Sequence, residues 1–327
     1  MIMFNRRVTR SVFAAAAAFL MLLAAMPTKA HALTGAAADY NAIIFGDFIA
    51  PSGSDVEGRL AVGGNAALGS YSVGDKLSAG EIAANPDVLV VGGNLTGTTG
   101  RVYFGNAQVG GTANVGGSFT VDGVLGSTLP FNFANVEQEL KDLSGILDAM
   151  ATNGSTLNQW GGLTLTGTDS DTNVFRLTTS ELESAHTLNI ATPNGSTAIV
   201  NIVGESGGLT NMGIFGSDRT KTLFNFINAT HVNLSGIGVE GSILAPFAAI
   251  NGGPGVTYGQ VVAASWDGAH QINHVPFGGD LPTPDPTPGP TPGIGPVIAT
   301  PEPTTALLGF ITAGFVALGA SHRRRIL

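Results

Sequence analysis

The sequence predicts an all-β fold, a β-solenoid (β-helix) with one amphipathic α-helix on its flank. Three observations predict it. The segment from Leu33 to Asp280 is dense in glycine, and its short apolar runs end at Gly-Gly, Gly-Asn or Asn-Gly pairs, which is typical of strands and tight turns. One glycine-containing phrase recurs along this segment. A single stretch of the same segment has apolar residues at helical spacing instead.

The recurring phrase gives the size of the repeat. Val62-Gly63-Gly64-Asn65 returns as Val91-Gly92-Gly93-Asn94, and two later segments that begin at Gly241 and Gly259 align with each other. An interval of roughly 20 residues fits one coil of a solenoid, in which inward side chains form a continuous column. A β-sandwich is the main alternative. It would place polar residues on outward strand faces, whereas Asp87–Val91 is an apolar run closed by glycine.

The helical stretch begins at Phe133. Its apolar residues recur at three- and four-residue spacing, with acidic residues and one lysine between them, so an amphipathic helix is expected to pack against the flank of the solenoid. The residues of its apolar face are Phe133, Val136, Leu140, Leu143, Ile146, Leu147 and Met150. Asn132 is the expected N-cap, and Asn153-Gly154 the expected stop.

Residues 1–32 have the pattern of a secretory signal peptide. Three arginines precede an unbroken apolar run, and Ala30-His31-Ala32 is the small-x-small cleavage site, so the mature chain should begin at Leu33. The Sec machinery is the expected export route. The Arg6-Arg7 pair leaves twin-arginine export as the alternative.

Two further segments follow the predicted solenoid of residues 33–280. Residues 281–300 alternate proline with threonine, aspartate and glycine, a composition that favours an extended polyproline stalk. Residues 301–327 begin with Pro301-Glu302-Pro303, continue with an uncharged apolar stretch at 304–320 that can just span a bilayer, and end near Arg323-Arg324-Arg325. Arginines stay on the cytoplasmic side, so the chain before this helix should lie outside.

The order of these three parts at the C-terminus resembles the PEP-CTERM sorting signal. That resemblance implies that an exosortase, a membrane enzyme, cleaves near Pro301 to Pro303 after the chain has been held transiently in the inner membrane. The mature protein is then expected at the cell surface or outside the cell. A plain single-span anchor explains the helix and the arginines but not the Pro-Glu-Pro.

The central segment also resembles a known family. The residues that carry the resemblance are Ala38–Phe48, Val56–Asn65, Val239–Pro246, Trp266 and Val275–Phe277. They are similar to the choice-of-anchor A domain, an extracellular domain that is joined to different anchoring signals. The resemblance implies an adhesin-like role for which no catalytic residues can be carried over. The phrase at Val239–Ala245 and the flanking helix also resemble the solenoid of ice-binding proteins.

Composition restricts the partners of the mature chain. Between Leu33 and Thr300 there are 22 acidic and seven basic residues, a formal net charge of −15, which should repel nucleic acid and anionic membrane surfaces. Divalent cations and neutral, hydroxyl-rich polymers such as exopolysaccharide are the better expectation. The chain has no cysteine, which excludes disulfides and cysteine nucleophiles.

Candidate chemical sites are few. Asp169, Asp171 and Asn173 place oxygen donors at alternate positions as a calcium loop does, but Val174 and Ser180 stand where an EF-hand needs glycine and glutamate. An exposed turn without a cofactor is therefore expected, with calcium as the alternative. His270 and His274 are expected in a closing loop. The Gly-x-Ser-x-Gly match at 204–208 is not followed by a helical pattern, so a glycine turn is expected there.

These observations together predict a non-enzymatic surface or extracellular-matrix protein of the biofilm, sorted by an exosortase. The alternative is a solenoid that binds carbohydrate or ice through a flat face. A polysaccharide-active enzyme is the third reading, and the sequence offers no catalytic cluster for it.

Overall fold

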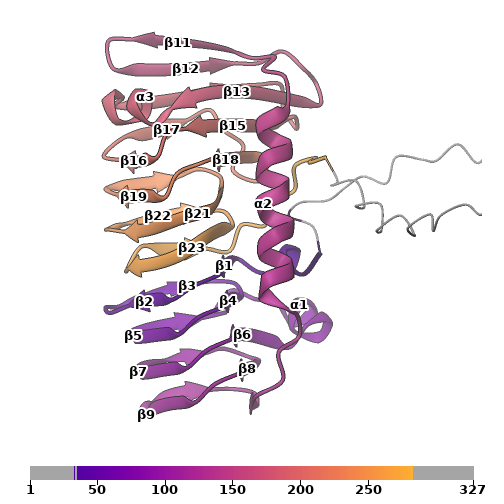
Figure 1. Cartoon of the computed structure of the whole chain (residues 1–327), viewed down its shortest axis with the longest axis vertical. Helices are drawn as coiled ribbons and strands as arrows, with labels where there is room; N and C mark the ends of the chain where they lie inside the picture. The colour runs from indigo at the N-terminus through magenta and orange to yellow at the C-terminus, as the bar shows by residue number, and fades with distance from the viewer. Residues whose placement is uncertain (1–32, 34, 283–327) are drawn as a thin grey trace, which may run out of the picture. The chain divides into compact units, whose positions relative to one another are not determined.

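A computed structural model describes residue 33 and residues 35–282, and these form a stack of short strands with a helix along its side (Figure 1). The strands lie in parallel ladders, so each coil pairs with the coil before and after it. The fold is therefore the predicted β-solenoid and not a β-sandwich. Among the described strands, the one antiparallel pair is β11 with β12.

Three ladders make up the three sides of the solenoid. The helix-covered face comprises β1 (Ala42–Ile44), β4 (Leu60–Val62), β6 (Asp87–Val91), β8 (Asn106–Val109), β10 (Leu125–Gly126), β13 (Thr172–Thr178), β15 (Thr197–Val203), β18 (Thr222–Phe226) and the first parts of β21 (Ser242–Gly252) and β23 (Val261–Gly268). The second side, called here the groove face, comprises β2 (Phe48–Ala50), the first parts of β5 (Ala66–Val73), β7 (Leu95–Val102) and β9 (Ala113–Val121), β16 (Ser206–Thr210), β19 (His231–Ser235) and the last parts of β21 and β23.

The third face continues from the second parts of β5, β7 and β9. It comprises these parts with β3 (Ser54–Val56), β20 (Ile237–Val239), β22 (Gly255–Tyr258) and β24 (Gln271–Asn273). A separate four-stranded sheet holds β11 (Ser155–Gln159), β12 (Gly162–Thr166), β14 (Thr187–Ala191) and β17 (Gly213–Phe215), and β17 contacts β20. The remaining elements are the 3₁₀ helix η1 (Gly35–Asp39) and the helices α1 (Ala79–Ala84), α2 (Phe133–Ala149) and α3 (Thr179–Ser184).

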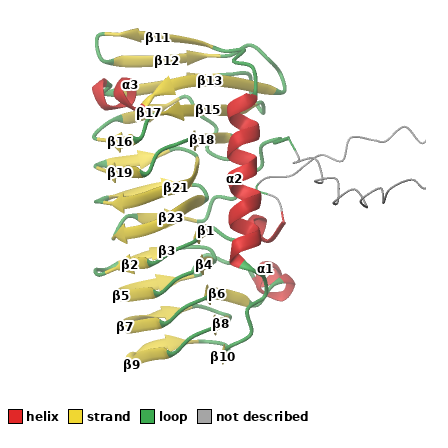
Figure 2. Ribbon diagram, viewed as in Figure 1, coloured by secondary structure: helices red, strands yellow, loops and turns green. Residues whose placement is uncertain are grey.

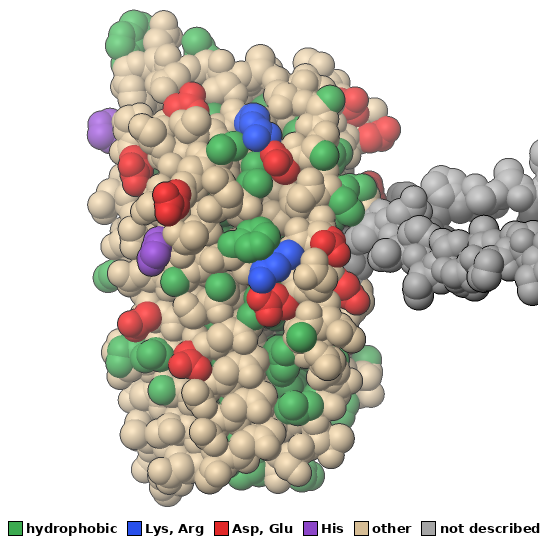
Figure 3. All heavy atoms as spheres, in the orientation of Figure 1, with side chains coloured by type: hydrophobic (Ala, Val, Ile, Leu, Met, Phe, Trp, Pro, Cys, Tyr) green, Lys and Arg blue, Asp and Glu red, His purple; other side chains and the backbone are tan. Residues whose placement is uncertain are grey.

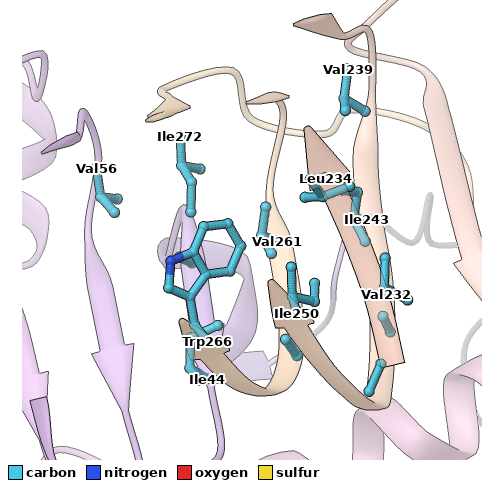
Figure 4. Close-up of a cluster of buried hydrophobic side chains, with 14 of the residues drawn as sticks. Ile44, Val56, Val232, Leu234, Val239, Ile243, Ile250, Val261, Trp266 and Ile272 are labelled. Carbon is cyan, nitrogen blue, oxygen red and sulfur yellow. The ribbon is translucent and has the colours of Figure 1, made fainter. Parts of the chain in front are cut away.

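The chain builds the solenoid in two directions from a central seam. Its first coils run from β1 away to β10, α2 then runs back along the stack, and the later coils return from β11 to β24 (Figures 1 and 2). The last coil consequently pairs with the first, with Ala42 beside Val261 and Phe48 beside Trp266. Figure 4 shows the core at this seam, where the Trp266 indole lies among apolar side chains from both parts of the chain.

The late sequence repeat is confirmed in the second half of the chain. The segments that begin at Gly241 and Gly259 lie on neighbouring coils, and Ile243, Leu244 and Ala245 are in register with Val261, Val262 and Ala263. The aliphatic residues at alternate positions enter the interior column. Parallel stacking therefore explains the sequence repeat directly.

The Gly-Gly-Asn phrase forms the corner between the helix-covered face and the groove face. At each corner a side-chain oxygen accepts a hydrogen bond from a backbone N–H of the neighbouring coil. Asp47 accepts from Asn65 N at 2.7 Å, Asn65 accepts from Asn94 N at 3.0 Å, and Asn94 accepts from Thr112 N at 2.8 Å. These bonds satisfy turn amides that have no ladder partner.

Helix α2 packs against the helix-covered face, as its pattern predicts. The Asn132 side chain accepts from the Ala134 and Asn135 amides, which confirms the predicted N-cap. Val136, Leu140, Leu143 and Leu147 are buried in a second apolar cluster against Ile43, Ala61, Val90, Ile199, Leu223 and Leu244. The expected stop at Asn153-Gly154 is wrong, because Met150 is the C-cap and the Asn153 side chain instead accepts from Val174 N in β13.

Both apolar clusters lie within Leu33–Leu281, so this segment contains its own core. None of the helices in residues 35–282 is long and apolar enough to cross a membrane. The predicted signal peptide, the sorting residues Pro301, Glu302, Pro303, Arg323, Arg324 and Arg325, and most of the predicted stalk lie outside the described residues.

Candidate functional site: a polar groove on the uncovered face

The groove face carries a shallow groove of about 520 Å³ where coils of the second half meet the first coil. Its lining comes from β19, β21, β23 and β2, which are neighbours across the seam. Side chains of the groove face that point inward, such as Val232, Ile250 and Trp266, belong to the apolar core. The outward side chains are therefore held on a rigid support.

Three outward polar side chains follow one another along the groove. Asn233, Asn251 and Asp267 are exposed and in direct register on successive strands, so they are spaced by about 4.8 Å, the distance between paired strands. Within the described residues these three side chains make no hydrogen bond. Their amide and carboxylate groups are free to bind a ligand, in contrast to the corner asparagines Asn65 and Asn94, which bind backbone amides.

Small or apolar side chains lie beside this polar column. Ala249 and Ser265 are half-buried and pair with each other in register. Ile49 pairs with Asp267 on the next strand, and 42% of its surface is exposed. His231 and Asp47 also line the groove. The groove thus combines hydrogen-bonding groups at regular spacing with apolar surface, which is the usual composition of a small-ligand or polymer site. Figure 3 shows one side of the molecule on which charged side chains are scattered among neutral ones.

The sequence did not single out these groove residues. Each sits at an outward position of a strand, and a period-two pattern marks such positions only once the strand and its register are known. The late repeat does not give the pairing of Asn251 with Asp267, because the register of β21 against β23 shifts between Ala245 and Ala249.

The predicted calcium-like loop is a hydrogen-bonded turn. Asp169 Oδ1 accepts from the Asp171 and Thr172 amides, and Asn173 is fully buried with its amide bonded to Asp169 O and Ser196 Oγ. These contacts use Oδ1 and the backbone carbonyl of Asp169 and orient Asn173 inward. In the part of the chain that the structure describes, no group of three or more His, Asp or Glu residues is placed to hold a metal ion.

The two close histidines have separate surroundings. His270 is fully buried, and its ring nitrogens lie 3.0 Å from Thr257 Oγ1 and 3.1 Å from Gly253 O. Burial lowers the pKa of His270, although hydrogen bonds to the Gly253 and Val256 backbone oppose the shift. His274 instead lies 2.7 Å from the Glu81 carboxylate. The structure therefore does not bring them together at one site.

A second cavity of about 260 Å³ at the seam contains Arg59, Glu81 and His274. The Arg59 guanidinium donates to the carbonyls of Glu81 at 2.6 Å and Asn85 at 2.8 Å, which ties α1 to the second coil. Partial burial would raise the pKa of Glu81, but hydrogen bonds from Ser78 and His274 outweigh it and lower the pKa to about 2. These groups are engaged with one another and join the first and last coils.

The Gly-x-Ser-x-Gly match begins at Gly204 and continues into β16. Ser206 starts this strand, and Gly207 packs against the Thr179 side chain. A nucleophile elbow needs a helix directly after the serine, whereas here a strand follows. The expected glycine turn is limited to the start of the match, where Gly204 has a φ of 149°, because Ser206, Gly207 and Gly208 belong to β16.

Comparison with known proteins identifies a family. No curated protein and no solved structure shows significant similarity to the chain. A family described as "Putative Ice-binding-like adhesive domain" matches residues 33–274, which include every described strand and α2. Because this match covers well over half of the sequence, the chain belongs to that ice-binding-like adhesive family.

Proposed function

We propose that the protein is a non-enzymatic surface adhesin that binds a neutral, hydroxyl-rich extracellular polymer, such as exopolysaccharide, in the groove of its groove face. Membership of an adhesive family supports an adhesin-like, surface-binding role at the cell surface or outside the cell. It also favours a non-enzymatic role. The binding surface and the class of polymer are proposed from the structure of the groove.

The main support for this binding surface is the column of Asn233, Asn251 and Asp267. Carboxamides both donate and accept hydrogen bonds and carboxylates accept them, so the column can bind hydroxyl groups at repeated spacing. Each bond to a neutral hydroxyl contributes little by itself, and an extended polymer that contacts several rungs gains from their sum. The formal charge of −15 between Leu33 and Thr300 disfavours polyanions as the partner.

The proposed function is tested by measuring how strongly the fragment of residues 33–282 binds different ligands. Purified protein is incubated with neutral exopolysaccharide, collagen and ice, and the bound fraction is measured for each, with and without calcium. Retention on neutral polysaccharide is expected. Retention on none of the three, or a glycosidase or lyase activity on the polysaccharide, would contradict the proposal.

Ice is the second candidate ligand, because the family description is ice-binding-like. The Thr164-Leu165-Thr166 pattern in β12 suits such a surface, but its register neighbours in β14 are Asn189 and Ala191. The regular threonine array that an ice-binding face would show is therefore not repeated on the next strand. Selective retention on ice would favour this candidate over the polymer.

We also propose that export and sorting follow the pattern of the two ends of the chain. The signal peptide is removed after Ala32, and an exosortase cleaves near Pro301 to Pro303, consistent with the resemblance to choice-of-anchor A proteins that carry a PEP-CTERM signal. The support is the order of Pro-Glu-Pro, apolar stretch and arginines. Intact-mass measurement of the protein from the medium or cell surface should give a C-terminus near Pro303. A mass that retains the residues after Pro303 would mean that the C-terminal segment is a plain membrane anchor. In a second test, Arg323, Arg324 and Arg325 are replaced by neutral residues. Unchanged release of this variant into the medium would contradict a role of the arginines in sorting.

A further inference from the structure

We propose that the end of the solenoid formed by residues 106–129, called here the open end, is an interface at which two copies of the chain form a symmetric dimer. β9 pairs with β7 along one edge, and the described residues supply no strand for its other edge. An unprotected edge strand presents unpaired N–H and C=O groups that favour pairing with another strand. At the far end of the stack the antiparallel strand β11 pairs with β12, and its outer edge likewise has no partner among the described strands.

The open end exposes apolar side chains that would otherwise be covered by a next coil. Val124, Leu125 and Leu129 have 64%, 45% and 36% of their surface exposed. Val115 and Val121 of β9 belong to the edge of the interior apolar cluster and are only partly buried. A partner at this end would therefore bury apolar surface and continue the core.

Charge distribution favours a second copy at this end. The domain is strongly acidic, so two copies repel each other across most of their surfaces. Within residues 106–129 the one charged residue is Asp122, and Arg101 neutralises it at 2.7 Å. On the face that Figure 3 shows, no charged side chain appears at the lower end, where Figure 1 places β9. The lysines and prolines that protect natural edge strands are absent from this segment.

The shape of β9 fits a two-fold axis. The strand bends at Gly116-Gly117, with Ala113–Val115 on the groove face and Ser118–Val121 on the third face. An axis through this corner places each half antiparallel to the other half of the second copy, with Asn114 opposite Thr120. The same rotation brings β10 against β10 on the remaining side. Such an isologous contact satisfies both open edges at once.

The size of the open end approaches that of a stable interface. Its free part extends over residues 113–129, because β8 is already paired with β6 and β10, and standard protein interfaces use about 20–30 residues on each side. The predicted stalk at 281–300 is a poor alternative occupant, because its alternating prolines lack the N–H donors that a strand partner needs.

Light scattering of residues 33–282 over a wide concentration range tests the dimer. The wild type should reach twice the monomer mass. The double variant Asn114→Lys, Thr120→Lys should remain monomeric, because it places like charges opposite each other across the axis. Both side chains are exposed in one copy, so folding should be retained. The matched control Asn251→Lys, Thr187→Lys changes exposed positions away from the open end and should still dimerise. Monomer at every concentration, or a dimer in the first double variant, would overturn the proposal.

A cysteine cross-link tests the position of the axis independently. The natural chain has no cysteine, and a side chain at Gly117 would meet no atom within 4 Å. Two copies of this residue beside the axis lie within disulfide reach, so the Gly117→Cys variant should form a covalent dimer on mild oxidation. Gly145→Cys, at an equally open site on α2, is the control and should not. Equal cross-linking of both variants, or of neither, would contradict the proposed axis.

Discussion

The Ser144 hydroxyl in α2 donates a hydrogen bond of 2.7 Å to Asn225 Oδ1 in β18, although the two lie far apart in sequence. Asn225 donates in turn to Ser144 O at 3.1 Å and to Asn201 Oδ1 at 2.9 Å, and Asn201 donates to Leu147 O at 2.7 Å. All three polar side chains are buried. This network fixes the helix on the solenoid in one position, which apolar contacts alone specify less well.

Replacing Asn225 with leucine should therefore destabilise the fold. The substitution leaves Ser144 and Asn201 as buried polar groups without this partner, and each such loss costs about 1–3 kcal/mol. Urea unfolding of residues 33–282 measures the change. The exposed-site control Asn158→Ala should stay within about 0.5 kcal/mol of the wild type. Equal stability of Asn225→Leu and wild type would mean that the network does not hold the helix.

Leu143→Asp tests the apolar part of the same contact. Leu143 is 1% exposed in the cluster beneath α2. Truncating a buried leucine costs about 2–5 kcal/mol, and burying an unpaired carboxylate adds to that cost. We expect a large fall in melting temperature or failure to fold. Asn135→Asp adds the same charge at an exposed position in the first helical turn and should be tolerated. An unchanged melting temperature for Leu143→Asp would show that the helix is not packed.

Gly92→Ala tests the reason for the Gly-Gly-Asn phrase. A Cβ at Gly92 would overlap the backbone carbonyl of Gly63 in the coil beside it. Because the backbone of neither coil can move easily, we expect the free energy of unfolding to fall by about 1–3 kcal/mol, the usual cost of overpacking. Gly145→Ala, at an open helical site, should be neutral or stabilising. Both free energies come from chemical unfolding, and a neutral Gly92→Ala would contradict close stacking at this corner.

Sequence reasoning succeeded where one local pattern decides the structure. The repeat at Gly241 and Gly259 contained a true register, and the spacing of apolar residues gave the buried face of α2. The central seam could not be predicted in this way. Ala42 in the first coil pairs with Val261 in the last, and no local signal states that these two coils meet. The side of the groove formed by Asp47 and Ile49 depends on this seam, whereas the pairing of Asn251 with Asp267 follows a register shift that the 18-residue repeat does not contain.

Acidification should weaken the fold through His270. Its pKa in the folded protein lies below the usual value of about 6.5, so the unfolded chain binds the proton more readily. Stability contributed by neutral His270 is therefore present at neutral pH and falls as pH drops below about 6.5 towards the folded pKa. The drop in melting temperature between neutral pH and about pH 5 should be smaller in His270→Gln than in wild type. The exposed-site control His186→Gln should keep the full drop. An equal drop in His270→Gln would assign the effect to another group.

The most direct test of the central claim is the binding of residues 33–282 to neutral exopolysaccharide after Asn233 and Asn251 are both replaced by alanine. Both side chains are exposed and make no hydrogen bond among the described residues, so the fold should be unchanged. Loss of two or more ligand bonds at about 0.5–1.5 kcal/mol each should weaken binding roughly five-fold or more. The control Thr164→Ala, Thr166→Ala alters β12 and should bind like the wild type. Full binding by the groove variant, or equal weakening in the control, would contradict adhesion through the groove face.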